Sequence, residues 1–201
     1  PNYTERIRAV RSATGETPDS TQLLWEFADA NRAVLEQLPS RINPESLEKA
    51  LDIFEKAHAI HVMGARRSFM VASYMTYALA HVDKPALLVN GLGGMYGEQL
   101  RAMSQHDALL TISFSPYAEE SQKACEDAHQ RGLPSVVITD SNLSPLARFA
   151  DVVFVVNEAE VKSFRSLTAS LCLTQTLAIA LGVRQDKTRD KEKGRDKKRK
   201  A

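Results

Sequence analysis

Two adjacent arginines stand in a segment that is suited to hold a small anion. The segment is "VMGARRS", in which Arg66 and Arg67 lie between Gly64 and Ser68. A guanidinium binds carboxylate and phosphate oxygens through paired hydrogen bonds, and the free N–H groups at a helix start favour negative charge. We expect Ser68 to open a helix, so the segment predicts an anion site. The alternative is that Ser68 is only a cap and both arginines are solvated.

A second segment, "TISFSPY", adds hydroxyl groups to this chemistry. Ser113 ends an apolar run, Ser115 stands two residues later, and Pro116 and Tyr117 come next. Ser115 is suited to cap a helix that begins at Pro116, because proline has no N–H to leave unpaired there. Ser113 has no capping duty. We therefore expect Ser113 and Ser115 to line the ligand site, with Tyr117 as a further contact.

Two other loops carry weaker signals. The segment "VNGLGGMYGEQL" has four glycines at positions 91–97, but it has neither the Gly-Lys-Ser/Thr ending of a P-loop nor the dinucleotide-binding spacing. It is either a flexible turn or a ligand loop. Asp140, Ser141 and Ser144 follow another apolar run and predict turn and cap residues.

The sequence contains no evident catalytic or metal-binding pattern. Cys125 and Cys172 lack metal-ligand spacing and predict idle thiols in a reducing cytoplasm. The histidines have neither HxH nor HxxxH spacing: His58, His61, His81, His106 and His129. We expect no catalytic residue, no metal and no cofactor.

The anion-binding segments are positioned by short apolar runs that alternate with helical stretches near 67–81, 94–104, 117–131 and 143–149. Nearly unbroken runs of this kind are typical of parallel strands buried on both faces. The runs are Ala59–Met63, Ala86–Val89, Leu109–Phe114, Val136–Thr139 and Val152–Val156. They predict a doubly wound α/β fold, a three-layer α/β/α sandwich with a five-stranded parallel sheet. Ligands of such sheets bind beyond the carboxyl ends of the strands, where both segments lie.

Helices are expected before and after this sheet. The apolar spacing over residues 20–38 predicts a helix that stops at Pro39, and Asn43 predicts the cap of a second helix that begins at Pro44. A last helix, over about 162–182, is apolar on nearly every side. Such a helix is buried in the core or against a second subunit, and we favour a dimer interface.

Composition and charge exclude some classes of protein. Of the 201 residues, 43% are hydrophobic and 25% charged, which is typical of a soluble globular domain. No apolar run approaches the roughly 20 residues of a membrane span, and the N-terminus has no signal-peptide pattern. Residues 187–201 have nine Lys/Arg and three Asp/Glu, a net charge of +6, so the rest carries −5 of the total +1. This basic segment predicts a disordered solvated tail, with non-specific nucleic-acid contact as the alternative.

Taken together, the loops resemble the sugar isomerase (SIS) domain, and more closely the effector-binding domain of RpiR-type (MurR/RpiR) bacterial transcriptional regulators. In that family a Gly-x-Gly-x-Ser loop and a Ser-x-Ser-Gly-x-Thr loop hold a sugar phosphate, and Gly64, Ser68, Ser113 and Ser115 stand at matching positions. "DSNLSPLARFADVVFVV" and "FRSLTASLCLTQTLAIALG" are similar to the segment after the family's fourth strand and to its last helix.

The resemblance implies a division of the chain and a set of partners. The opening "PNYTERIRA" resembles the end of the family's helix-turn-helix domain, so residues 1–19 are expected to be a remnant of that domain plus a linker. Residues 20–184 would be the SIS domain and 185–201 the basic disordered tail. The implied protein is a cytoplasmic homodimer or dimer of dimers without a membrane partner. It would bind DNA through an N-terminal domain mostly absent from this chain.

Three departures from the family pattern bear on the ligand. Arg66 stands where the first loop's second glycine is expected, Pro116 replaces the glycine of the second loop, and Ala118 its threonine. We expect a small polyhydroxy anion, either a sugar phosphate or a sugar acid.

Two rival functions stay open on the same fold. One is an aldose–ketose sugar phosphate isomerase, which needs a general base. By position the base would be one of Glu98, His106, Glu119 and Glu158. The other is a scaffold whose pocket binds nothing.

Overall fold

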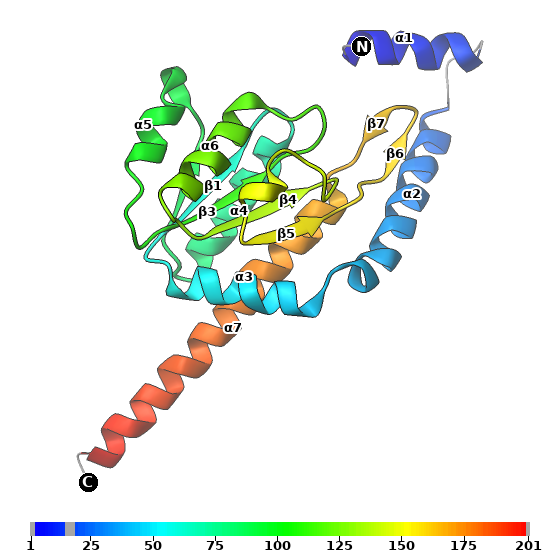
Figure 1. Ribbon diagram of the computed structural model, residues 1–201. Helices are drawn as coiled ribbons and strands as arrows, with labels where there is room; N and C mark the ends of the chain where they lie inside the picture. The colour runs from blue at the N-terminus through cyan, green and yellow to red at the C-terminus, as the bar shows by residue number, and fades with distance from the viewer. Residues whose placement is uncertain (1–2, 15–18, 200–201) are drawn as a thin grey trace.

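In a computed structural model, which describes residues 3–14 and 19–199, a five-stranded parallel sheet forms the centre of the molecule (Figure 1). The strand order is β2-β1-β3-β4-β5. The strands are β1 (Ile60–Gly64), β2 (Ala86–Val89), β3 (Ala108–Ile112), β4 (Ser135–Thr139) and β5 (Val152–Val155). Every residue of β1, β3 and β4 is buried, as the unbroken apolar runs predict. The register pairs Gly64 with Ile112, so the loops after β1 and β3 leave the sheet side by side.

Helices cover both faces of the sheet and confirm the predicted three-layer sandwich. Side chains alternate along a strand, so Val62 of β1 lies in one core and Met63 in the other. The larger core contains α3 (Pro44–Lys56), α4 (Ser68–His81) and the first part of α7 (Thr168–Arg199). The other face is covered by α5 (Tyr96–Arg101), α6 (Glu119–Gln130) and the short 3-10 helix η2 (Ala147–Phe149). A second 3-10 helix, η1 (Leu92–Gly94), precedes α5.

Three helices precede the sheet in the described residues, and the sequence predicts the second and the third of them. They are α1 (Tyr3–Thr14), α2 (Ser20–Arg41) and α3. Asn43 caps α3 by accepting the N–H of Glu45, and Pro44 is the first helical residue, which confirms that prediction. The expected linker includes residues 15–18, which lie outside the described residues.

The prediction that α2 stops at Pro39 is wrong, because the helix continues to Arg41. Proline removes only its own N–H from the helix, and later residues still bond, as the N–H of Ile42 does to the carbonyl of Leu38. Since Pro39 lies in the last turn and is exposed, the lost bond does not end the helix.

The last helix begins later than predicted. Residues 160–165 form an antiparallel hairpin instead, made of β6 (Glu160–Val161) and β7 (Phe164–Arg165). Lys162 and Ser163 form its turn with φ values of 50° and 66°. Two successive positive φ values suit a two-residue hairpin turn, and this local conformation outweighs the helical apolar spacing.

Helix α7 is buried along one side and exposed along another. Leu173, Leu177 and Leu181 lie in the core, whereas Ile179 and Val183 are exposed. Part of the apolar surface is therefore buried within this chain, and the dimer interface stays a prediction. The helix continues through Arg199 and extends away from the sheet (Figure 1), where the sequence predicts a disordered tail. Lys, Arg and Glu are good helix formers, so a helix that starts in the core propagates into the basic segment.

Within the described ranges, no helix combines the length and apolar character needed to cross a membrane.

Candidate functional site

A hollow of about 130 Å³ lies at the carboxyl ends of β1 and β3, between the loops that lead into α4 and α6. Its lining residues are Ala65, Arg66, Arg67, Ser68, Ser113, Phe114, Ser115, Pro116 and Ala118. The structure thus brings the two predicted segments together, and five of the seven predicted site residues line the hollow. The other two, Gly64 and Tyr117, lie beside it in the chain but are not lining residues.

Gly64 allows α4 to begin directly above the end of β1. A Cβ atom at this position would lie 2.5 Å from the backbone oxygen of Ser68, closer than any side chain can approach. Ser68 is the first residue of α4, as predicted, and it is buried. Its N–H donates to the carbonyl of Ala65 over 3.1 Å. The role of Gly64 is therefore close packing, which presents Ser68 to the hollow.

Arg66 holds a left-handed backbone conformation, with a φ of 55°. This conformation costs roughly 1–2 kcal/mol for a residue that has a Cβ, and it is where glycine is favoured. Glycine is also the residue that the family resemblance leads one to expect at this position. In this chain the exposed guanidinium of Arg66 is added to the rim of the hollow.

Arg67 is partly buried and only partly hydrogen-bonded. Its Nη1 donates to the carbonyls of Arg165 and Ser166 over 3.3 and 3.4 Å. Its Nη2 is buried and has no hydrogen-bond partner within the described part of the chain. The guanidinium lies 5.4 Å from the centre of the Phe114 ring, within cation–π range. Burial, and next the charge of Arg165, lower the pKa of Arg67, yet arginine stays charged at neutral pH.

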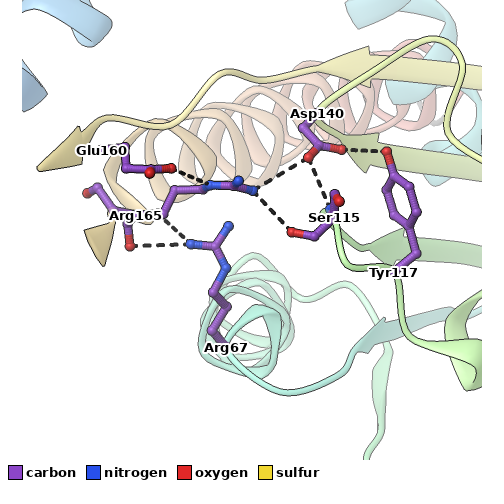
Figure 2. Close-up of polar contacts among 7 residues, drawn as sticks. Arg67, Ser115, Tyr117, Asp140, Glu160 and Arg165 are labelled. Carbon is purple, nitrogen blue, oxygen red and sulfur yellow. Dashed lines mark hydrogen bonds and ion pairs between the residues drawn. The ribbon is translucent and has the colours of Figure 1, made fainter. Parts of the chain in front are cut away.

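A single carboxylate organises the loop after β3. Figure 2 shows Asp140, directly after β4, accepting the N–H of Ser115 over 3.0 Å and the hydroxyl of Tyr117 over 2.8 Å. Arg165 of the hairpin donates to the carbonyl of Ser115 over 3.2 Å and lies 3.5 Å from Asp140. Arg165 also pairs with Glu160 over 3.3 Å. The Ser115 backbone is thus held from two sides.

The prediction that Ser115 caps a helix beginning at Pro116 is wrong. Helix α6 begins at Glu119, and Ala118 precedes it. Because Asp140 and Arg165 fix the backbone of Ser115, the chain runs on past Pro116 before it turns into the helix. Ser113 is buried and extends the strand ladder, since its N–H donates to the carbonyl of Ile138 over 3.0 Å.

Tyr117 points away from the hollow. Its hydroxyl binds Asp140, and its ring packs on a small buried cluster formed by Cys125, Val137 and Leu146. Burial, and next the hydrogen bond to Asp140, raise the pKa of Tyr117. Its place in the structure is a support for the loop rather than a contact in the hollow.

Asp140 and Arg165 support this site, although the sequence pattern indicates a site role for neither. Asp140 was interpreted as a turn residue, although its position directly after a buried strand is a usual place for a polar group that serves a site. Arg165 gave no signal, because the turn Lys162-Ser163 lacks the Asn-Gly or Asp-Gly pair that marks a hairpin.

The glycine-rich segment forms a turn at the end of β2. Its positive φ values are 62° at Gly91, 67° at Gly93 and 83° at Gly94. Asn90 and Gln99 close the turn by bonding each other, and both also bond its backbone. The segment does not line the hollow.

None of the four candidate general bases lines the hollow. Glu98 pairs with Arg101, and Glu119 pairs with Lys123. His106 precedes β3, at the amino end of the sheet. Glu158 accepts the N–H groups of Ala169 and Ser170 at the start of α7.

No group of three metal-ligating side chains gathers among the residues that the structure describes. Cys125 is buried, and its burial raises the pKa of its thiol to about 11.

Comparison with protein families gives one match, the SIS domain, over residues 53–180. A curated relative from Thermotoga maritima, an uncharacterized HTH-type transcriptional regulator, is 27% identical over 172 residues. That alignment covers 83% of this chain and 61% of the relative, so the chain spans less than two thirds of that protein.

Solved structures with a similar fold include two that are named after transcription factors of this kind or their ligand complexes. The sugar isomerase domain of an RpiR transcription factor from Sphaerobacter thermophilus has a TM-score of 0.78 and 25% identity, over 83% of this chain and 93% of that one. The NanR protein of Vibrio vulnificus, complexed with ManNAc-6P, has a TM-score of 0.74 and 22% identity, over 95% of this chain and 71% of that one.

Proposed function

The chain belongs to the SIS domain family, and from this premise we propose that it is the ligand-sensing domain of a DNA-binding transcriptional regulator. Its effector is a sugar phosphate or a related sugar-derived metabolite. The names of the Thermotoga and Sphaerobacter proteins support the regulatory role, and the ManNAc-6P complex of the Vibrio protein supports the ligand class.

The observation that carries the proposal is the hollow at Arg67. The guanidinium of Arg67 is partly buried, and its buried Nη2 has no hydrogen-bond partner among the residues that the structure describes. Such an atom is costly unless an acceptor reaches it, and charge-assisted bonds to an anion are strong. The hydroxyls of Ser68 and Ser113, on the facing loops, suit the oxygens of a small anion. We assign the anion to the region between Arg66–Ser68 and Ser113–Ser115.

The departures at Arg66 and Pro116 affect which anion fits. Arg66 adds a positive charge at the rim, whereas Pro116 has no N–H to offer to a phosphate. A phosphate would therefore depend on the guanidinium groups, and a sugar acid would use the same groups. Both ligands are tested below.

The isomerase is the less favoured function. Proton transfer between neighbouring carbons requires a base within hydrogen-bond reach of the sugar. In the described part of the chain, the hollow is lined by guanidinium groups, hydroxyls and apolar atoms, without carboxylate or imidazole groups. An NMR assay of aldose and ketose phosphates with purified protein tests the rival directly, and turnover of about 1 per second or faster would support it.

The experiment that tests the sensor is a thermal-shift screen with matched compounds. ManNAc-6P is compared with ManNAc, and other sugar phosphates with their sugars, polyols and acids. A ligand at 100 times its Kd adds about 2.7 kcal/mol to the free energy of unfolding. Stabilisation by phosphates alone supports the phosphate site. Stabilisation by acids alone moves the effector class to sugar acids, and no stabilisation by any anion contradicts the proposal.

A homodimer and DNA contact belong to the same proposal. Helix α1 includes most of the segment whose sequence resembles the end of a helix-turn-helix domain. Helix α7 exposes Ile179 and Val183, which are available for a contact with a second subunit. Sedimentation velocity tests the dimer, and replacement of Ile179 by Glu is expected to yield monomer. If the Ile179→Glu variant had the same sedimentation coefficient as a dimeric wild type, the dimer contact would not include this face of α7.

A further inference from the structure

The β6–β7 hairpin lies between the hollow and the N-terminal helices. It is not part of the central sheet, and each of its strands has two residues. Figure 1 shows the hairpin beside α2 and close to α1, and β6 packs on α2. A short hairpin outside the main sheet can change position without breaking the bonds between the five central strands.

The contacts of the hairpin with the hollow are long. Arg165 donates to Ser115 over 3.2 Å and lies 3.5 Å from Asp140. The carbonyls of Arg165 and Ser166 accept from Arg67 over 3.3 and 3.4 Å. These distances are at or beyond the upper end of the range for N–H···O hydrogen bonds, about 2.7–3.2 Å. Each bond is therefore weak and can be exchanged for a better one.

The contacts of the hairpin with the N-terminal helices are closer. Arg6 of α1 donates to the carbonyl of Ser163 over 2.9 Å, and the ring centres of Tyr3 and Phe164 are 4.9 Å apart. Lys162 forms an ion pair with Glu26 of α2. The hairpin is thus held more firmly by α1 and α2 than by the loops of the hollow.

The space under α1 leaves room for movement. An apolar hollow of about 400 Å³ lies between α1, α2 and the hairpin. Its lining residues are Ile7, Val10, Arg11, Leu23, Phe27, Lys162 and Phe164. Protein interiors are close-packed and seldom leave voids larger than a water molecule. Because the interface at this hollow is not close-packed, α1 can shift here at the cost of few contacts.

We propose that the β6–β7 hairpin couples occupancy of the anion hollow to the position of α1 and α2. This inference rests on the proposed function. An anion in the hollow binds the Arg67 guanidinium through charge-assisted bonds, which are stronger than the long bonds from Nη1 to the hairpin carbonyls. An anion that binds both terminal nitrogens of Arg67 must take Nη1 as well as the unpartnered Nη2, and it therefore competes for Nη1 with the carbonyls of Arg165 and Ser166. A released hairpin follows α1 and α2, so the anion favours one arrangement of these helices over the other.

The first test needs no ligand. Amide hydrogen exchange of α1, residues 3–14, is measured in the wild type, Arg67→Ala and Arg165→Ala. Arg131→Ala is the matched control, because Arg131 is also a partly buried arginine that binds two carbonyls, those of Leu100 and Met103, but outside this region. Both hollow-side variants are expected to speed exchange in α1, and Arg131→Ala to leave it unchanged. Equal α1 exchange in all four proteins would overturn the coupling.

The second test uses ManNAc-6P and the single tryptophan of the chain. Trp25 is 66% exposed on α2, next to the Glu26 that pairs with Lys162. ManNAc-6P is expected to change its emission in the wild type, whereas ManNAc does not. Lys162→Ala is expected to lose this response and to bind ManNAc-6P about fivefold more tightly, because a loosened hairpin competes less for Arg67. If Lys162→Ala only destabilised the fold, the variant would not bind ManNAc-6P more tightly than the wild type.

The outcomes separate the two proposals. Calorimetric binding of ManNAc-6P with no change in Trp25 emission contradicts the coupling but leaves the sensor site intact. If neither ManNAc-6P nor any other anion of the matched screen binds, the proposed function fails, and the exchange of α1 in Arg67→Ala and Arg165→Ala still decides whether the hairpin connects these regions.

Discussion

The guanidinium of Arg165 lies 3.5 Å from the carboxylate of Asp140, although the two residues are 25 positions apart, with Asp140 after β4 and Arg165 in β7. Neither residue lines the hollow. Together they hold the backbone of Ser115, which does line it. This wall of the candidate site is therefore held mainly by Asp140, and Arg165 adds a longer bond from the hairpin.

Replacement of Asp140 by Ala is expected to lower the free energy of unfolding by about 1–3 kcal/mol, because the N–H of Ser115 and the hydroxyl of Tyr117 lose their acceptor. Tyr117→Phe removes one of these bonds and is expected to cost about 1 kcal/mol. Urea unfolding measures both values. A cost for Asp140→Ala no larger than that of Tyr117→Phe would mean that Asp140 does not organise the loop.

The positive φ of Arg66 predicts a difference between two substitutions that both remove its charge. Arg66→Gly relieves the left-handed strain, whereas Arg66→Ala keeps it, so the glycine variant is expected to be more stable by about 1 kcal/mol. Both variants are expected to bind phosphate compounds more weakly than the wild type, and to similar extents. Weakening in the alanine variant alone would show that backbone geometry, and not the guanidinium, governs the affinity.

The close approach of Gly64 to α4 predicts a costly substitution. In Gly64→Ala the new Cβ would meet the Ser68 backbone at 2.5 Å, so α4 must shift, at an expected cost of about 1–3 kcal/mol. Gly97→Ala is the matched control, since Gly97 is helical and its Cβ would meet only the end of the flexible Arg101 side chain. Thermal unfolding should show a lower Tm for the first variant and an equal or higher Tm for the second. Equal stability of both variants would contradict this packing.

A buried histidine at the amino end of the sheet predicts acid sensitivity. Nε2 of His61 lies 3.3 Å from Asp107, and both side chains are almost inaccessible to solvent. Burial lowers the pKa of His61 below its ordinary value of 6.5, although Asp107 opposes this effect. The unfolded chain therefore binds the proton more readily than the folded one. Stability is expected to be complete above pH 6.5 and to fall as the pH decreases toward the lowered pKa.

Urea midpoints at pH 7.5 and 5.5 measure this loss. Replacement of His61 by Gln removes the titrating group, so the variant should lose less stability than the wild type over the same interval. The pKa of Asp107 is also lowered, below 3.8, so that carboxyl titrates outside this window. The same loss in both proteins would assign the acid sensitivity to other groups.

Much of the fold can be predicted from periodicity because both faces of the sheet are covered. The apolar runs at β1, β3 and β4 are nearly unbroken, and their boundaries agree with the structure within about two residues. Asn43 and Pro44 mark the start of α3 through local chemistry that needs no tertiary contact. The SIS resemblance likewise depends on local sequence, namely the two loops after β1 and β3, the segment after β4 and the last helix.

The parts that depend on distant contacts could not be predicted. Ser115 is a favourable residue type for a helix cap. Its backbone is instead bonded by Asp140 and Arg165, so no helix begins directly after it. The turn at Lys162 and Ser163 replaces a helix that the apolar spacing indicates. The start of α7 is instead set by Glu158, which accepts two N–H groups of its first turn.

The central claim is that a sugar-derived anion binds between the loops after β1 and β3. Amide chemical-shift mapping with ManNAc-6P, alongside ManNAc and inorganic phosphate, tests it most directly. We predict that the phosphate compounds shift the amides of residues 65–68, 113–115 and 117–118, that ManNAc alone does not, and that Arg67→Ala abolishes the shifts. Shifts confined to other regions, or none with any anion, would contradict the claim.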